Sequence, residues 1–318
     1  MTKAPVYAAV VSKFDRVESR LMPQPSPLER LVDERFAARG VRVLLKRDDL
    51  VHPEIPGNKW RKLRLNLDEA HRHHRRPLLT FGGAYSNHLR AVAAAGHRYG
   101  LATVGVVRGE ELARKPLNWS LTYCADRGMR LVFLDRSTYR RKHDPEVIER
   151  LSEEHGDFFL LPEGGSNALA VKGAMDIPSE IEVEYDVICC PVGTGGSLAG
   201  IAAGLPPQAS AVGFSALKGG DFLVGEVARL QAEAGVSSAN WRVETRFHFG
   251  GFAKRTPELD AFIADFERRH GLRLEWTYVA KMMHGIVELS SSGDIPAGAT
   301  VVAVITGPAT TDRGAGGT

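Results

Sequence analysis

Four basic side chains stand close together in the stretch PEIPGNKWRKLRLNL, residues 53–67, at Lys59, Arg61, Lys62 and Arg64. Cations at the start of a predicted helix are ordinarily solvated surface charges. A lysine amine that is shielded from water can instead act as a base or a nucleophile near neutral pH. The other motifs of the chain decide between these two interpretations of Lys59.

A glycine-rich turn within CPVGTGGSLAGIAAGL, residues 190–205, is the strongest sign of a ligand. An apolar strand is predicted to end at Val192 and an alanine-rich helix to begin near Ser197. Between them, the backbone N–H groups around Gly193, Gly195 and Gly196 could point at one phosphate, assisted by the helix dipole. The alternative is a tight strand-to-helix turn that binds nothing.

The same turn restricts which phosphate compound could bind. A nucleoside-triphosphate loop carries a lysine followed by serine or threonine after its second glycine, and this turn has no such pair. A dinucleotide turn needs a third glycine where Leu198 stands and an acidic residue about twenty residues later, near Phe214 and Ser215. These differences disfavour a nicotinamide-dependent oxidoreductase and leave a small cofactor with a single phosphate.

A second motif, TFGGAYSNHLRAVAAAG at residues 80–96, places Ser86, Asn87 and His88 at or just before a predicted helix. Unpaired N–H groups and short polar side chains at such a position can hold a carboxylate, for example that of an amino-acid substrate. The alternative interpretation is that Ser86 or Asn87 merely caps the helix.

Polar residues near the C-terminus form a third group of candidates. LEWTYVAKMMHG contains Tyr278, Lys281 and His284, and Thr306 follows the last predicted strand. A tyrosine between apolar stretches usually packs in or near the core, and Thr306 could be a simple turn residue. In HRHHRRP no carboxylate or cysteine completes a ligand set with the histidines, which are His71, His73 and His74. We therefore predict no metal site.

The elements that must position these residues alternate between strands and helices. Apolar strands are predicted over 41–50, 76–83, 101–107, 129–135, 157–165, 185–193, 210–217 and 299–307. Helices are predicted over 58–74, 86–100, 116–128, 145–156, 197–205, 221–235 and 256–271. This order, with strands that are almost wholly apolar, indicates an α/β protein with parallel sheets covered by helices.

Composition restricts the class of protein further. At 318 residues the chain is longer than one compact core needs, so two domains are expected. The net charge of +3 is small and interleaved with acidic residues, which gives no support for nucleic-acid binding. Three cysteines argue against a disulfide framework and for a cytoplasmic protein. We find neither a signal peptide at the N-terminus nor an apolar run that could cross a membrane.

Taken in order, the motifs resemble one known family. GNKWRKL, GGAYSNH, GTGGSLAG, GGFAKRTPEL, YVAKMMHG and ITG are similar to motifs of the pyridoxal-phosphate-dependent 1-aminocyclopropane-1-carboxylate deaminase and D-cysteine desulfhydrase family, from about residue 43 to residue 306. The resemblance implies fold type II, the tryptophan synthase β-like fold, with two doubly wound α/β domains. Residues 1–75 and 166–318 would form the large cofactor domain and 76–165 a small mobile domain. The family resemblance also suggests a homodimer.

The resemblance also implies roles for the cofactor-binding residues. Lys59 would form the Schiff base with pyridoxal 5′-phosphate, and Asn87 would bond the ring hydroxyl. The turn that would hold the phosphate consists of Gly193, Thr194, Gly195 and Gly196. Thr306 matches the residue beside the pyridine nitrogen, where a hydroxyl stabilises a pyridinium charge less than a carboxylate does.

Other matched positions would face the substrate. Ser86 would face the reacting carbon, and Ser86, Asn87 and His88 would bind the substrate carboxylate. Tyr278 matches the tyrosine that in the family lies over the substrate. Because the cofactor acts as an electron sink, the protein has to orient the substrate and supply a base. The released Lys59 amine, desolvated near the cofactor, is suited to carry that proton.

Three positions depart from the family pattern. Phe252 stands where a tyrosine is frequent, Val279 where a deaminase has glutamate, and Ile305 where many members have histidine. Without those polar groups, cyclopropane ring opening is disfavoured. We therefore expect α,β-elimination from a small amino acid, as in a D-cysteine desulfhydrase, giving a keto acid and ammonia. The alternatives are ring opening, β-replacement, racemase-like activity, or a relative that binds the cofactor or an amino acid without turnover.

Overall fold

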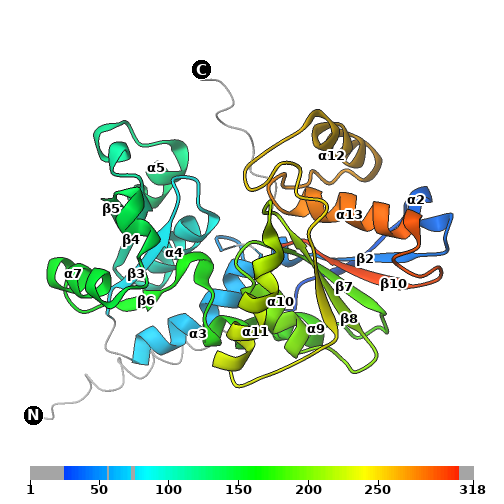
Figure 1. Cartoon of the computed structure of the whole chain (residues 1–318), viewed down its shortest axis with the longest axis horizontal. Coiled ribbons are helices and arrows are strands. Elements are labelled where there is room, and N and C mark those ends of the chain that lie inside the picture. The colour runs from blue at the N-terminus through cyan, green and yellow to red at the C-terminus, as the bar shows by residue number, and fades with distance from the viewer. Residues whose placement is uncertain (1–24, 56, 73–75, 308–318) are drawn as a thin grey trace, which may run out of the picture.

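The computed structural model describes residues 25–55, 57–72 and 76–307. The predicted absence of a signal peptide concerns residues 1–24, which lie outside this range, as do His73 and His74. The described chain forms two sheets with helices packed on both faces of each (Figure 1). The predicted α/β architecture with mostly parallel sheets is confirmed.

The larger sheet has six strands in the described chain, in the order β1-β2-β10-β7-β8-β9, and only β1 and β2 pair antiparallel. The strands are β1 Leu28–Leu31, β2 Arg42–Lys46, β7 Val187–Val192, β8 Ser210–Ser215, β9 Trp241–Glu244 and β10 Thr300–Val304. Successive strand residues face opposite sides. Val301 and Ala303 therefore join one core, and Val302 and Val304 join another.

Helices from different parts of the chain cover the two faces of this sheet (Figure 1). The first core includes residues of α2 Glu34–Ala37, α12 Pro257–His270 and α13 Val279–Ser292. The second includes residues of α8 Ala168–Ala174, α9 Asp176–Ser179, α10 Gly196–Ala203 and α11 Leu223–Glu233. A parallel sheet covered on both faces explains why its strands are apolar throughout.

The smaller sheet is entirely parallel, with four strands within the described residues in the order β5-β4-β3-β6. The strands are β3 Leu78–Gly82, β4 Thr103–Arg108, β5 Met129–Leu134 and β6 Phe159–Leu161. One face packs on α3 Asn58–Arg72, α4 Asn87–Tyr99 and α5 Trp119–Asp126. The other face packs on α6 Arg136–Arg140 and α7 Pro145–His155. All four strands lie within the predicted small domain; its boundaries and its mobility stay predictions.

The sequence did not predict every element. The long helix α13 was missed, although His284, Glu288, Ser291 and Ser292 form a narrow polar stripe along it; ten of its residues are buried. The short edge strands β1 and β9 and the helix α8 were missed as well. The strand predicted over 41–50 ends earlier, at Lys46, and a 3₁₀ turn, η1 Asp48–Leu50, follows it.

A buried ion-pair network fixes α3 to the larger sheet. Arg61 is 1% exposed and pairs with Asp48 at 3.0 Å and with Glu180, whose carboxylate also accepts from Lys46 at 2.6 Å. Loss of one partner would leave another charge buried and unpaired, which is strongly destabilising. Arg61 is thus a structural cation, and the helix start that carries Lys59 is held in place by it.

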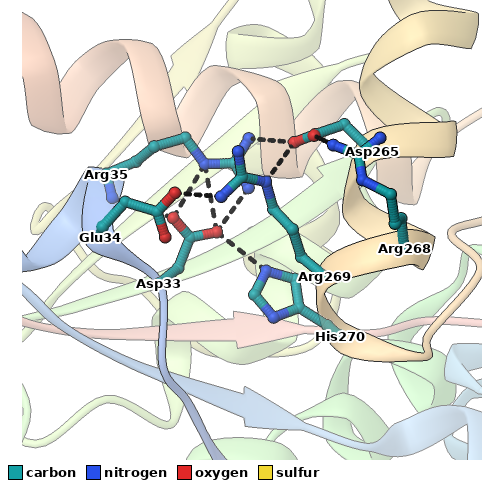
Figure 2. A network of polar contacts seen from close by, with 7 residues as sticks. All are labelled: Asp33, Glu34, Arg35, Asp265, Arg268, Arg269 and His270. Carbon is teal, nitrogen blue, oxygen red and sulfur yellow. Dashed lines mark hydrogen bonds and ion pairs between the residues drawn. The ribbon is translucent and has the colours of Figure 1, made fainter.

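A second polar network joins α2 to α12 (Figure 2). The buried carboxylate of Asp33 accepts from Arg35 Nε at 2.9 Å and lies 2.9 Å from His270 Nε2. Burial alone would raise the pKa of Asp33, but the hydrogen bonds from Arg35 and His270 hold it well below its usual range. Arg269 extends the network to Glu34 and Asp265. Because α12 also packs against α13, this network supports the helix that follows Tyr278.

Candidate active site

Gly57 determines how α3 begins beside the end of β10. Its φ is +70°, and its N–H donates to Asp48 O at 2.8 Å. A Cβ at this position would lie 1.6 Å from the carbonyl oxygen of Thr306, so only glycine fits. The close approach brings the start of α3, with Lys59 in its first turn, against the segment that contains Thr306.

Lys59 lies in the first turn of α3, where its side chain is partly buried. Burial lowers the pKa of its amine from 10.5 to about 8, and no charged partner among the described residues opposes this shift. About a tenth of an amine with this pKa is unprotonated at pH 7. This burial disfavours the interpretation of Lys59 as a solvated surface charge, and its role as the reactive lysine stays a prediction.

Lys62 is the principal site residue that sequence reasoning missed. It is 2% exposed, and its Nζ donates to Gly164 O at 3.1 Å, to Ser166 Oγ at 3.0 Å and to Thr194 Oγ1 at 3.5 Å. Burial, with the nearby charge of Lys59, lowers its pKa well below the usual value. The available signal was the spacing of three residues, which puts Lys59 and Lys62 on the same helix face.

The glycine-rich turn lies directly against Lys62. Gly195 has a φ of +79° and precedes α10 as its N-cap, without a side-chain cap. A Cβ at Gly196 would lie 2.6 Å from Ser166 Oγ and 3.1 Å from Lys62 Nζ, so a side chain there would displace both. The start of α3 is tied to this turn by Asn58, whose amide donates to Ser197 Oγ at 2.9 Å.

These groups are arranged so that they could bind an anion. A helix N-terminus, a turn of small residues and a buried ammonium meet around Thr194, whose Oγ1 lies 2.7 Å from Ser166 Oγ. Nζ of Lys62 has only neutral oxygens as hydrogen-bond partners among the described residues. An anion with several oxygens, such as a phosphate, would favour the charged form of the Lys62 amine. It would also accept hydrogen bonds from the N–H groups of the glycine-rich turn.

The predicted carboxylate-binding motif stands at the start of α4. Ser86 is the N-cap, and its Oγ accepts from the backbone N–H groups of His88 and Leu89, both at 3.2 Å. The capping interpretation of Ser86 is therefore correct, yet its hydroxyl proton stays available for donation. Asn87 is partly buried, and its side-chain oxygen accepts from Arg90 one turn later.

His88 lies deeper than its neighbours, with its ring directed at β3. Its Nε2 is 2.9 Å from Thr80 Oγ1, and that hydroxyl donates its proton to Leu161 O at 2.9 Å. Nε2 must therefore carry the ring proton, because the Thr80 hydroxyl can only accept from it. Burial and the charges of Lys59 and Lys62 lower the His88 pKa well below 6.5. The imidazole is neutral and faces the interior, which the sequence did not indicate.

Tyr278 approaches the glycine-rich turn from the other side. A Cβ at Gly193 would lie 3.0 Å from the Tyr278 hydroxyl, so the phenol packs on the turn itself. Burial, with smaller contributions from Glu275 and Glu163, raises the pKa of the phenol far above neutrality. The phenol therefore stays protonated at neutral pH. Glu275, another residue that the sequence did not reveal, accepts from the N–H groups of Thr277 and Tyr278 and fixes this helix start.

The three positions that depart from the family pattern differ in their surroundings. The ring of Phe252 lies 5.9 Å from that of Tyr278 and is 51% exposed. Val279 and Ile305 are both buried in the core against α13. Lys281 donates to His248 O at 2.9 Å and to Gly251 O at 2.7 Å, which holds the strained loop that carries Phe252. Of the three, Phe252 is thus the one whose side chain lies beside the Tyr278 ring.

The described part of the chain contains no group of three or more histidine, cysteine or carboxylate side chains placed to hold a metal ion. His71 instead contacts Leu67 O through Nδ1 at 2.7 Å. None of the described helices is long and apolar enough to span a membrane.

Comparison with known sequences finds relatives over most of the chain. Residues 20–307 match the family described as "Pyridoxal-phosphate dependent enzyme". A Thermotoga maritima protein provisionally named a 1-aminocyclopropane-1-carboxylate deaminase is 31% identical over 86% of this chain and 91% of its own length. A D-cysteine desulfhydrase of Klebsiella pneumoniae is 28% identical over 87% of this chain and 89% of its own length.

Solved structures show the same relationship. A crystal structure of a 1-aminocyclopropane-1-carboxylate deaminase homologue matches with a TM-score of 0.78 at 27% identity, covering 90% of both chains. A threonine deaminase of Solanum lycopersicum matches with a TM-score of 0.67 at 18% identity, covering 98% of this chain and 87% of its own. The second likeness shows a shared fold alone.

Proposed function

The chain belongs to the family of pyridoxal-phosphate-dependent enzymes that includes 1-aminocyclopropane-1-carboxylate deaminases and D-cysteine desulfhydrases, and on this premise we propose that it eliminates a β-substituent from a small amino acid. With D-cysteine, the bonds from Cα to hydrogen and from Cβ to sulfur break, one water is consumed, and sulfide, ammonia and pyruvate leave. The observation that carries the proposal is a lysine with a pKa near 8 beside a buried anion site on which a phenol packs.

The cofactor of this family, pyridoxal 5′-phosphate, fits the groups present. Its phosphate suits the anion site formed by Lys62, Thr194 and the turn at Gly193, Gly195 and Gly196. Its aldehyde suits the partly unprotonated amine of Lys59. When bound, the cofactor stabilises negative charge that develops on the substrate Cα. Asn87 at the ring hydroxyl and Thr306 at the ring nitrogen complete the proposed contacts.

The protein groups around the cofactor then have separate tasks. The Lys59 amine, once released from the cofactor, accepts the Cα proton, because a pKa near 8 suits proton transfer at neutral pH. Tyr278 keeps its proton and can donate it to a leaving group. Ser86 and Asn87 bind the substrate carboxylate at the start of α4. The ring of His88 is directed at β3 and its backbone N–H donates to Ser86 Oγ, so His88 would contribute by holding the Ser86 hydroxyl in place.

The surroundings of Tyr278 favour elimination over cyclopropane ring opening. The ring beside it belongs to Phe252, which has no hydroxyl to move a proton. Val279 is 1% exposed within an apolar core and offers no carboxylate. A thiolate is a good leaving group that needs one acid, which Tyr278 supplies. Ring opening needs further proton transfers for which these positions provide no group.

The experiment is a panel of D- and L-amino acids, with 1-aminocyclopropane-1-carboxylate, assayed for keto acid, ammonia and sulfide. We expect equal amounts of sulfide, pyruvate and ammonia from D-cysteine, and a visible absorption band that Lys59→Ala abolishes. We expect Tyr278→Phe to keep this band and lose about 100-fold or more in kcat. A keto acid from the cyclopropane substrate alone would overturn elimination in favour of ring opening, and a coloured protein that turns over nothing would identify a binding protein.

The proposal includes a homodimer in the cytoplasm. The family resemblance supports the dimer, and the odd number of cysteines, which are all free and buried, agrees with a reducing compartment. Light scattering on the purified protein would give the mass of the assembly, and twice the 34.7 kDa of one chain is expected.

A further inference from the structure

Arg90 in α4 contacts Asn87 and also the next helix, α5. One of its terminal nitrogens donates to the side-chain oxygen of Asn87. The other donates to Ser120 Oγ at 2.7 Å and to Tyr85 O at 3.3 Å. The guanidinium lies 4.6 Å from the centre of the Trp119 ring. Four neighbours, two on α5, one at the start of α4 and one just before it, therefore fix one side chain in place.

The surroundings of Arg90 are unusual for a cation. Its hydrogen-bond partners among the described residues are all neutral oxygens, and burial lowers its pKa. Glu275 attracts it electrostatically from beyond ion-pair distance. A charged group that is shielded from water without an ion-pair partner costs free energy. Packing on the Trp119 ring offsets part of that cost.

The contact with Arg90 decides how the amide of Asn87 is oriented. The oxygen and nitrogen of an asparagine amide are generally hard to tell apart, so their assignment rests on the partners. A guanidinium has donors only, so the atom of Asn87 that meets Arg90 must be its oxygen. The amide nitrogen, with both of its N–H groups, then points the other way and can only donate.

We propose that Arg90 is a positioning residue for the cofactor: it turns the amide of Asn87 so that Nδ2 donates to the ring oxygen of pyridoxal phosphate. This inference rests on the proposed function, in which Asn87 faces that oxygen. The bond from Arg90 also polarises the amide, and a polarised amide is a stronger donor to an oxygen that carries negative charge. Through Ser120 and Trp119, the orientation of this donor depends on α5.

The test compares Arg90→Met in two backgrounds, wild type and Asn87→Ala. The dissociation constant for pyridoxal phosphate is measured by titrating cofactor-free protein, and the pH midpoint of the cofactor's visible band is measured by absorption. In the wild-type background we expect the affinity for pyridoxal phosphate to fall about 5- to 10-fold, which corresponds to the loss of one hydrogen bond. We expect the pH midpoint of the visible band to rise, because the ring oxygen becomes more basic. In the Asn87→Ala background, Arg90→Met should change neither quantity.

Arg98→Met is the matched control, because Arg98 lies on the same helix, 47% exposed, and meets Glu54 at 3.8 Å. It should leave affinity and midpoint unchanged. Arg90→Lys keeps a donor-only group and should recover part of both. If Arg90→Met melts far below the wild-type apoprotein, Arg90→Lys is compared in the same two backgrounds, where a smaller loss is expected in the wild type and none in Asn87→Ala.

Equal losses from Arg90→Met in both backgrounds would overturn the inference, because Arg90 would then act independently of Asn87. An Asn87→Ala protein with unchanged affinity and midpoint would also overturn it. In that second case, a wild-type visible band that Lys59→Ala abolishes and turnover in the amino-acid panel would still uphold the proposed function. The two failures are therefore distinguishable.

Discussion

Replacing Lys59 with methionine should stabilise the cofactor-free protein at neutral pH. The pKa of the amine falls from 10.5 to about 8 when the chain folds. Each pKa unit corresponds to about 1.4 kcal/mol, so holding this charge in the folded state costs about 3 kcal/mol. Lys59→Met removes that cost and keeps the length of the side chain, so its free energy of unfolding at pH 7 should exceed the wild-type value by up to this amount.

The pH dependence gives the sharper test. Between pH 8 and 10.5 the unfolded state binds more protons than the folded state, so wild-type stability from this group rises with pH. Below pH 8 the full free-energy cost of burying the charged amine is present, and above pH 10.5 that cost is gone. The advantage of Lys59→Met should therefore shrink as the pH rises through this window. Taking the difference between two proteins cancels the titrating groups that do not interact with Lys59, whereas Lys62 and His88, whose pKa values its charge lowers, contribute to the difference.

Urea denaturation of apoproteins at several pH values, followed by circular dichroism, measures this difference. Lys172→Met is the control, because Lys172 is an exposed lysine on α8 and its replacement should change stability by less than about 0.5 kcal/mol at every pH. A Lys59→Met protein that is less stable at pH 7, or whose advantage is the same at pH 7 and 10.5, would refute the argument that the amine is desolvated.

Three further changes test other parts of the site. Lys62→Met should weaken binding of pyridoxal phosphate by about 10-fold or more. Binding of pyridoxal, which lacks the phosphate, should stay nearly unchanged. Equal losses for both ligands in equilibrium titrations would contradict the anion site. Lys281→Met leaves two carbonyl groups, one buried and one partly buried, without their donor. The loop at 248–253 should then become sensitive to limited proteolysis, at a cost of about 2–3 kcal/mol in the free energy of unfolding; unchanged cleavage would argue against that clamp. Gly57→Ala should lower the free energy of unfolding by more than about 3 kcal/mol, because its Cβ would overlap the Thr306 oxygen. Gly100→Ala, with the same φ of +70° but open space around it, should cost about 1–2 kcal/mol. Similar melting temperatures for the two variants would contradict the close contact.

The sequence by itself determined the fold class and the cofactor. Parallel strands covered on both faces are apolar throughout, and this local property is visible without coordinates. The sequence also predicted both ends of α4, because Ser86 caps its start and Gly100, with a φ of +70°, caps its end. Lys59 was identified because six motifs in a fixed order resemble one family. Its reactivity was an expectation that followed from that resemblance.

Tertiary structure decided which cations serve the site and which serve the fold. Arg61, Lys62 and Lys59 stand within four residues, yet Arg61 pairs with carboxylates, Lys62 meets neutral oxygens around Thr194, and Lys59 has no charged partner among the described residues. The partners of Lys62 come from segments more than a hundred residues away. Burial and charge at a side chain depend on such distant contacts, and a local pattern does not record them. For the same reason, the sequence did not show the inward-facing ring of His88 or the amide orientation that Arg90 imposes on Asn87.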